Sequence, residues 1–352
     1  MTTPPFNFKY SAHIPELLLE LKISLAISTY QAGKIIFISP KDHDHLISLP
    51  RTFDKPMGFD IQENQMVLAT KDAVICFENS KKLASHYPKK KNTYDTIFIP
   101  RTTFHTGQVD LHDIAFTPKG IFAVNTSFSC ICQIDTQHNF IPKWQPNFIT
   151  DLTSEDRCHL NGMVLKDGTP KYITALGTTN TPQGWRENIT KGGVLIDVTT
   201  DEIIFDQLAM PHSPMLYKGT LYGLLSATGQ FVKFNTENKT VEIIKELNGF
   251  CRGLDIIEDY AFIAMSKLRK NSSTFAKLSF AEKANTAGIK IIHLPTKALV
   301  GEIIYTNSVD EIYEIKGIKN TLRPNILNTT NPIHKMALST PNETFWAKEK
   351  IN

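Results

Sequence analysis

Short apolar stretches, each opened by a polar or otherwise special residue, recur along the chain. A turn and a second apolar run follow most of them, as at 121–126 and 221–226. The stretches lie roughly 40 to 60 residues apart, and each interval has room for about four strands of ordinary length. This spacing predicts a β-propeller, in which each stretch forms the inner strand of one blade. The six stretches are 56–61, 111–116, 160–165, 212–217, 251–256 and 310–315.

The two ends of the chain complete the count of blades. Three apolar runs at 25–28, 34–39 and 45–51 have no such stretch before them, and the last stretch has no blade after it. If the C-terminal strand becomes the inner strand of the first blade, the ring closes and leaves no exposed sheet edge. The sequence therefore predicts an all-β, six-bladed β-propeller closed by pairing the C-terminal strand with the N-terminal blade. A pair of β-sandwiches and an irregular all-β chain remain the alternatives.

The propeller is expected to occupy residues 22–324. Residues 1–21 before it form a predicted N-terminal arm with a short amphipathic helix at 14–21. A polar insertion at 266–288 interrupts the sixth interval. Residues 325–352 are rich in Asn, Thr and Pro and are predicted to be a mobile C-terminal tail.

The composition is that of a soluble globular protein, with 41% hydrophobic and 21% charged residues. The net charge of +3 does not indicate the strongly basic surface that is typical of nucleic-acid binding. No apolar run approaches the roughly 20 residues that cross a bilayer. The N-terminus lacks the basic and apolar regions of a signal peptide, and the five scattered cysteines suit a reducing compartment. We therefore expect a cytoplasmic protein that binds neither nucleic acid nor membrane. Its oligomeric state is left open.

Residues at one repeat position of a propeller converge on the mouth of the central channel from all blades. Only one residue of the predicted set, Met57, is apolar. A ring of polar groups is typical of a binding site, although a channel filled with water also has a polar lining. The predicted set is Met57, His112, Asn161, Ser213, Arg252 and Glu311.

Three histidines lie at or within two residues of this position in consecutive blades: His112, His159 and His212. Three converging imidazoles would suit a divalent transition metal such as Zn, Fe, Mn or Cu. Asn161 and Glu311 would then position a water or a substrate. Calcium is less favoured, because it prefers about six to eight oxygen ligands and few are present. The alternative is that each histidine is a hydrogen-bonded structural residue.

A long insert between strands, at 178–193, carries Trp185 and Arg186. These residue types anchor ligands by stacking and by forked hydrogen bonds, and the glycines of the insert would let it bend over the mouth as a lid. With Arg252 at the channel and Ser213 beside it, they predict a site for a small anionic molecule or a peptide segment.

Several longer motifs resemble those of a known protein family. They are STYQAGK at 28–34, VNTSFSC at 124–130, DRCHLNG at 156–162, GWREN at 184–188, MPHSP at 210–214 and GFCRGL at 249–254. Together they are similar to an uncharacterised family of bacterial conserved hypothetical proteins, over about residues 21–324. The resemblance implies a bacterial origin and a propeller-like fold. It implies no reaction, because the function of that family is not established.

The leading hypothesis is a propeller whose channel mouth binds a small anion or peptide and transforms it by metal-assisted chemistry. Hydrolysis, lactone chemistry or oxidation of a peptide would fit such a site. The rival hypothesis is a non-catalytic scaffold for protein–protein interaction, since a fold does not decide a function.

Overall fold

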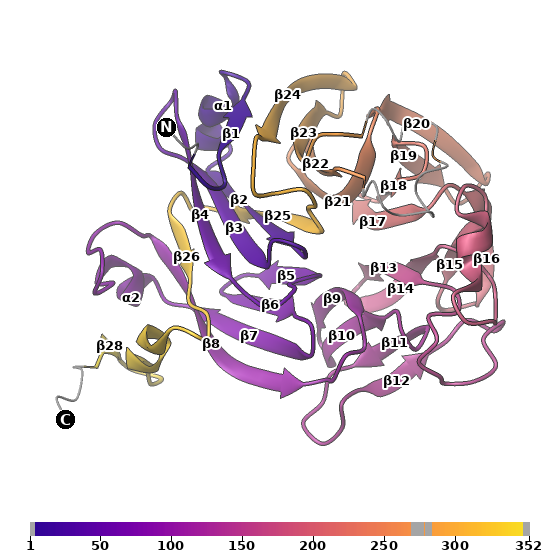
Figure 1. Cartoon of the computed structure of the whole chain (residues 1–352), viewed down its shortest axis with the longest axis horizontal. Coiled ribbons are helices and arrows are strands. Elements are labelled where there is room, and N and C mark those ends of the chain that lie inside the picture. The colour runs from indigo at the N-terminus through magenta and orange to yellow at the C-terminus, as the bar shows by residue number, and fades with distance from the viewer. Residues whose placement is uncertain (1–3, 269–277, 279–283, 348–352) are drawn as a thin grey trace.

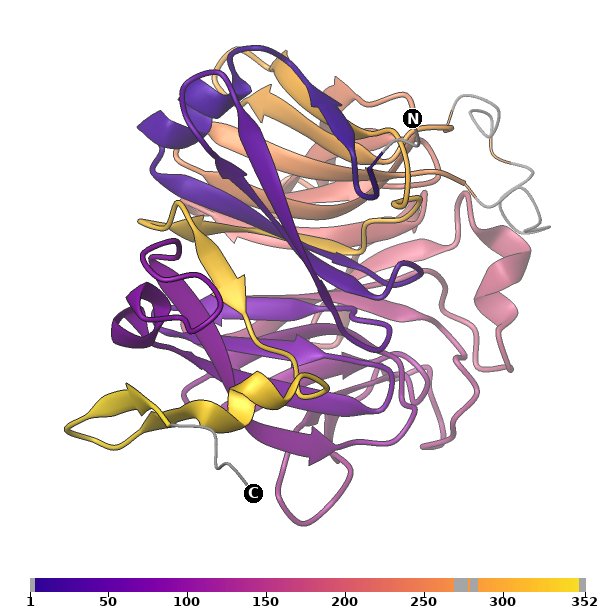
Figure 2. The ribbon, with the colours of Figure 1, turned by 60° about the vertical axis from the view of Figure 1, so that its left-hand side comes forward.

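The computed structural model describes residues 4–268, 278 and 284–347. Six sheets stand in a ring around a central axis (Figure 1), and within each sheet the strands that follow one another along the chain pair antiparallel. The predicted six-bladed β-propeller is therefore confirmed. Figure 2 shows the ring obliquely, turned by 60° from the view of Figure 1. Among the described residues, no helix has the length and apolar character needed to span a membrane.

The blades are numbered in chain order, and their strands are given from the axis outward. Blade 1 contains β25 (Glu314–Lys319), β2 (Ile23–Thr29), β3 (Lys34–Pro40) and β4 (Leu46–Thr52). Blade 2 contains β5 (Phe59–Gln62), β6 (Gln65–Ala69), β7 (Ala73–Asn79), β8 (Thr96–His105) and β26 (Pro324–Ile326). Blade 3 contains β9 (Leu111–Thr117), β10 (Gly120–Asn125), β11 (Cys130–Gln133) and β12 (Ile141–Trp144).

The remaining blades follow the same order. Blade 4 contains β13 (Leu160–Lys166), β14 (Thr169–Ala175), β15 (Gly193–Asp197) and β16 (Glu202–Leu208). Blade 5 contains β17 (Pro211–Tyr217), β18 (Thr220–Leu225), β19 (Gln230–Asn235) and β20 (Thr240–Glu246). Blade 6 contains β21 (Phe250–Ile257), β22 (Tyr260–Ser266), β23 (Gly288–His293), β24 (Ala298–Tyr305) and β1 (Phe8–Tyr10).

The ring closes as the sequence predicts. Strand β25, from the C-terminal part of the chain, pairs antiparallel with β2, with Ile315 opposite Ile27. The inner strand begins at Glu314, a few residues later than the apolar pattern indicated.

The segments at both ends of the chain pack against the ring. The predicted helix forms as α1 (Ile14–Glu20) and buries Ile14, Leu17 and Leu18 between blades 6 and 1. Strand β26 pairs parallel with β8, and the chain beyond it forms η2 (Pro332–Met336), β27 (Ala337–Ser339) and β28 (Thr344–Trp346). Near this segment lies α2 (Lys81–Ser85), which shares a buried cluster with it. Residues 1–3, 348–352 and most of the predicted insertion at 266–288 lie outside the described residues.

Buried hydroxyls link neighbouring blades by hydrogen bonds to backbone carbonyls, and we call these the fastening hydroxyls and the fastened carbonyls. In four blades, a Ser or Thr at the end of the second strand donates a hydrogen bond to a backbone carbonyl at the start of the next blade's inner strand. The donor–acceptor pairs are Ser28–Met57 (2.7 Å), Thr126–Leu160 (2.6 Å), Ser226–Cys251 (2.5 Å) and Ser266–Ile312 (3.1 Å). These bonds fix the height of one inner strand relative to the next.

A second set of contacts lies further along the channel. Asp60, Asp113 and Asp255 each accept a hydrogen bond from a backbone N–H of the following blade. The negative charges of these three residues and of Glu314 act on Lys316, which lies on β25. Burial by itself would lower the pKa of Lys316, but the four carboxylates raise it above its usual value. The charge of Lys316 is therefore coupled to those of the four carboxylates.

Substitution of a fastening hydroxyl should destabilise the ring. Ser266→Ala removes the bond that Ser266 donates to the carbonyl of Ile312 and the one it accepts from the N–H of that residue. Both backbone groups would be left buried without partners, so we expect a loss of about 1–3 kcal/mol in the free energy of unfolding. Urea denaturation measures the loss. Ser154→Ala, at an exposed position, is the matched control and should match the wild type; an equal stability of Ser266→Ala would contradict the prediction.

Glu314 should make stability depend on pH. Burial raises its pKa from an ordinary value of 4.5 to about 7, against the opposing charge of Lys316. The folded state therefore binds an extra proton between these values, and stability falls as pH rises from about 4.5 to about 7. Glu314→Gln should remove this loss. Between pH 4.5 and pH 8, the free energy of unfolding of the variant should rise by up to about 3 kcal/mol relative to that of the wild type, as measured by urea denaturation. A pH-independent difference would refute this assignment.

Candidate functional site

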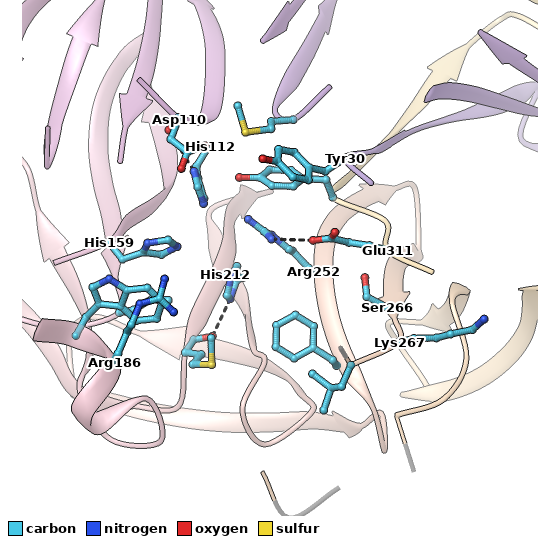
Figure 3. Close-up of a pocket in the computed structure, with 17 residues that line it drawn as sticks. Tyr30, Asp110, His112, His159, Arg186, His212, Arg252, Ser266, Lys267 and Glu311 are labelled. Carbon is cyan, nitrogen blue, oxygen red and sulfur yellow. Dashed lines mark hydrogen bonds and ion pairs between the residues drawn. The ribbon is translucent and has the colours of Figure 1, made fainter. Parts of the chain in front are cut away.

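A cavity of about 420 Å³ opens at one mouth of the channel (Figure 3). This volume lies within the range of roughly 300–1,000 Å³ that is usual for small-molecule sites. Most of the predicted site residues line it, together with Met57. They are His112, His159, Trp185, Arg186, His212, Arg252 and Glu311.

Ser213 and Asn161 do not line the cavity. The hydroxyl of Ser213 accepts a hydrogen bond from the N–H of Gly253 and so links blades 5 and 6. Asn161 is buried, and its Nδ2 has no hydrogen-bond partner among the described residues. Strand pairing is irregular at both residues, between Leu160 and Met163 and between His212 and Met215. Such bulges re-aim side chains, so simple alternation does not give their direction.

His112 and His212 have the same backbone setting in blades 3 and 5. The Nδ1 atom of each ring lies 3.2 Å and 3.0 Å, respectively, from the carbonyl oxygen of the residue two positions earlier, Asp110 or Met210. A carbonyl only accepts hydrogen bonds, so Nδ1 carries the proton and a neutral ring keeps a lone pair at Nε2. Burial lowers the pKa of both rings well below its usual value, and the charge of Arg252 lowers it further. Both imidazoles are therefore neutral hydrogen-bond acceptors.

His159 is held differently. Its Nδ1 lies 2.9 Å and 3.0 Å from the two carboxylate oxygens of Asp156. The indole N–H of Trp185 donates to the same carboxylate at 3.0 Å, and the ring of Trp185 lies against His159 with centroids 4.3 Å apart. The ring of His112 approaches from another side, edge to face, at 4.8 Å. His159 thus sits at the junction of a carboxylate, an indole and a second imidazole.

The predicted lid segment at 178–193 lies beside the cavity. Its helix η1 (Gly184–Asn188) buries Trp185 and places the guanidinium of Arg186 over the indole, 4.4 Å from the ring centroid. Gly177 makes this packing feasible, because a Cβ at that position would lie 2.9 Å from the Cβ of Trp185. The insert therefore forms one wall of the cavity.

Arg252 lies across the cavity from His159 (Figure 3). Its guanidinium stacks on the ring of Tyr313, with Cζ 3.6 Å from the ring centroid, and Nη1 lies 3.5 Å from Oε1 of Glu311. The remaining guanidinium nitrogens make no hydrogen bond to the described residues. Stacking fixes the plane of the guanidinium group, so its N–H donors point in fixed directions.

Other residues of the cavity escaped the sequence argument. Tyr30, Asp110, Lys267 and Tyr313 line it, and Asp156 supports it from behind. Tyr313 had a signal in the sequence, since it falls within the last apolar stretch at 310–315. The motif DRCHLNG contains Asp156, but nothing in the sequence shows that this carboxylate turns back toward His159.

In the described part of the chain, no three or more His, Cys, Asp or Glu side chains are arranged to hold a metal ion. Cys158 and Cys251 do not line the cavity, and burial raises the pKa of each thiol to about 12. The assignment of His112, His159 and His212 as ligands to Zn, Fe, Mn or Cu stays a prediction.

A family model described as "Domain of unknown function (DUF4915)" matches residues 12–327. The chain belongs to this family. Membership confirms the resemblance that its motifs suggested, to a family whose function is not established. No curated protein sequence matches the chain.

Solved structures of low sequence identity share the fold. A chain in the crystal structure of a nidogen/laminin complex is 11% identical, with a TM-score of 0.53, and the match covers 85% of this chain and 99% of that one. A putative 6-phosphogluconolactonase from Bacteroides fragilis NCTC 9343 is 16% identical, with a TM-score of 0.48, over 84% of this chain and 98% of that one. At these identities the likeness to the first structure concerns the fold alone.

The metal hypothesis has a direct test. If the three imidazoles hold a transition metal, elemental analysis of the untagged protein should find about one equivalent. A folded variant with His112→Ala, His159→Ala and His212→Ala should then contain none. Absence of metal from both proteins after reconstitution would end this hypothesis.

Proposed function

We propose that this DUF4915 protein binds a small organic anion, a carboxylate or phosphate that also carries hydroxyl or amine groups, at the mouth of its channel. The observation that carries this proposal is the fixed guanidinium of Arg252 inside the cavity. A planar guanidinium with oriented donors is suited to the two oxygens of a carboxylate or phosphate.

The charges around Arg252 support an anion rather than a neutral ligand. Glu311 offsets one positive charge at an Nη1–Oε1 distance of 3.5 Å, which is longer than an ideal charge-assisted hydrogen bond. Arg186 brings further positive charge to the lining and Asp110 brings a second negative one, whereas the ammonium of Lys267 pairs with Asp310 at 2.6 Å. The cavity therefore favours a ligand whose negative group sits near Arg252.

The two neutral imidazoles define the rest of the ligand. His112 and His212 present acceptor nitrogens, because their Nδ1–H groups are used on the protein side. An acceptor that faces a bound ligand stabilises it only when the ligand supplies a donor. Hydroxyl and amine groups meet this need, and the ring of Phe250, which also lines the cavity, would contact the carbon skeleton.

D-Gluconate and sorbitol make a matched pair of probes, since they differ by a carboxylate. Calorimetry should detect binding of gluconate and none of sorbitol. Arg252→Gln should weaken gluconate binding by roughly 10- to 100-fold, because it removes charged hydrogen bonds. Arg252→Lys should fall between the two, since it keeps the charge without the planar fork.

Arg101→Gln is the control variant. Arg101 contacts Ser339 and Ala337 near the C-terminal segment, away from the cavity, so its loss should leave gluconate binding unchanged. Equal affinity of wild type and a folded Arg252→Gln variant would overturn the proposed anion site.

A further inference from the structure

We propose that the cavity is the active site of an esterase for anionic esters or lactones, in which His159 is the general base and Asp156 is its positioning residue. This inference rests on the proposed function, because Arg252 must hold the anionic group of the substrate. Neither Asp156 nor a base role for His159 follows from the motifs of the sequence.

The partners of the three imidazoles single out His159. His112 and His212 donate from Nδ1 to neutral carbonyl oxygens, whereas His159 donates to the carboxylate of Asp156 at 2.9 Å. A carboxylate fixes the tautomer with the lone pair at Nε2 and stabilises the imidazolium that forms when Nε2 takes a proton. A carbonyl stabilises that cation much less. Proton uptake is therefore assigned to His159.

The backbone around this pair adopts an unusual conformation. Asp156 and His159 have φ values of 49° and 53°, in the left-handed region that residues other than glycine rarely occupy. Twenty other described residues that are not glycine also have a positive φ, so this conformation orients the two side chains but does not by itself mark a functional site. Here these φ values turn the side chains of Asp156 and His159 toward each other while His159 faces the cavity.

His112 completes a place for a water molecule. His112 and His159 both line the cavity (Figure 3). The centroids of their rings lie 4.8 Å apart, and both rings have Nδ1 bonded on the protein side. A water that donates one hydrogen bond to each Nε2 keeps its lone pairs directed away from the two rings. This arrangement prepares the oxygen of the water for attack on a carbonyl carbon held between His159 and Arg252.

The reaction uses only the ester and this water. Nε2 of His159 takes a proton from the water as its oxygen forms a bond to the carbonyl carbon. The tetrahedral adduct then collapses, the bond between that carbon and the alkoxy oxygen breaks, and the leaving oxygen takes the proton from Nε2. The products are a carboxylic acid and an alcohol, or one hydroxy acid from a lactone, and the protein is unchanged.

The probe is 4-nitrophenyl hydrogen glutarate, an activated ester with a free carboxylate. The wild type should release 4-nitrophenol with saturation kinetics, and should do so in EDTA. His159→Asn should lower kcat/KM by at least about 100-fold, the usual contribution of a general base. Asparagine tolerates a positive φ, so this variant should stay folded, as circular dichroism can verify. His293→Asn, on β23 and outside the cavity, is the matched control and should keep wild-type rates.

Asp156→Asn separates positioning from a merely structural role. We expect kcat to fall by more than 10-fold while gluconate affinity changes less than threefold. In nitrogen-15 spectra of labelled histidine, the share of His159 with its proton on Nε2 should rise, because an amide no longer fixes Nδ1–H. An unchanged tautomer with a collapsed gluconate affinity would show that Asp156 only supports the wall of the cavity.

The outcomes distinguish this inference from the function on which it rests. If the wild type binds gluconate but does not hydrolyse the probe above the buffer rate, or if a folded His159→Asn variant keeps full activity, the esterase assignment is wrong and the anion site stands. If gluconate does not bind at all, both fall.

Discussion

The ring depends on one recurring contact, the hydrogen bond from a buried hydroxyl of one blade to a carbonyl of the next. Apolar packing between blades is strong but has no direction, and it would tolerate sliding of one blade past its neighbour. A hydroxyl–carbonyl bond in a dry interior does not tolerate sliding, because a shifted blade leaves both groups unsatisfied. Ser28 accepts a further bond from the N–H of Glu314, so the same device also secures the closing strand β25.

This contact also positions the candidate site. Arg252 and Tyr313 each directly follow a fastened carbonyl, those of Cys251 and Ile312. Their side chains come from adjacent blades and stack at 3.6 Å. Because the fastening bonds hold the two inner strands at a fixed relative height, the guanidinium plane is set by the fold as well as by its neighbours. A cavity built in this way is preorganised, so less free energy is spent on ordering side chains when a ligand binds.

The sequence predicts the blades, the closure and most of the cavity lining, because these follow from a repeated apolar strand and its spacing. It is less reliable within each repeat. Gly58 and Tyr313 directly follow the carbonyls of Met57 and Ile312 that accept the hydroxyl hydrogen bonds, so they occupy the repeat position that Arg252 occupies in blade 6. The apolar pattern of the sequence assigns this position to Met57 and Glu311 instead. Short apolar stretches can be aligned one or two residues apart with equal quality, and bulges then redirect the side chains. Contacts such as Asp156 with His159 depend on left-handed backbone turns that apolar patterning does not report.

Asp156 couples the wall of the cavity to its chemistry. One of its oxygens, Oδ2, lies 3.0 Å from both Nδ1 of His159 and Nε1 of Trp185. A displacement of the insert that moves the indole must therefore weaken this shared contact or move the carboxylate with it. Since the carboxylate sets the orientation of the imidazole, a ligand that presses on Trp185 also acts on His159. The insert consequently affects how the base is held as well as which ligands fit, and changes within 178–193 should alter both together.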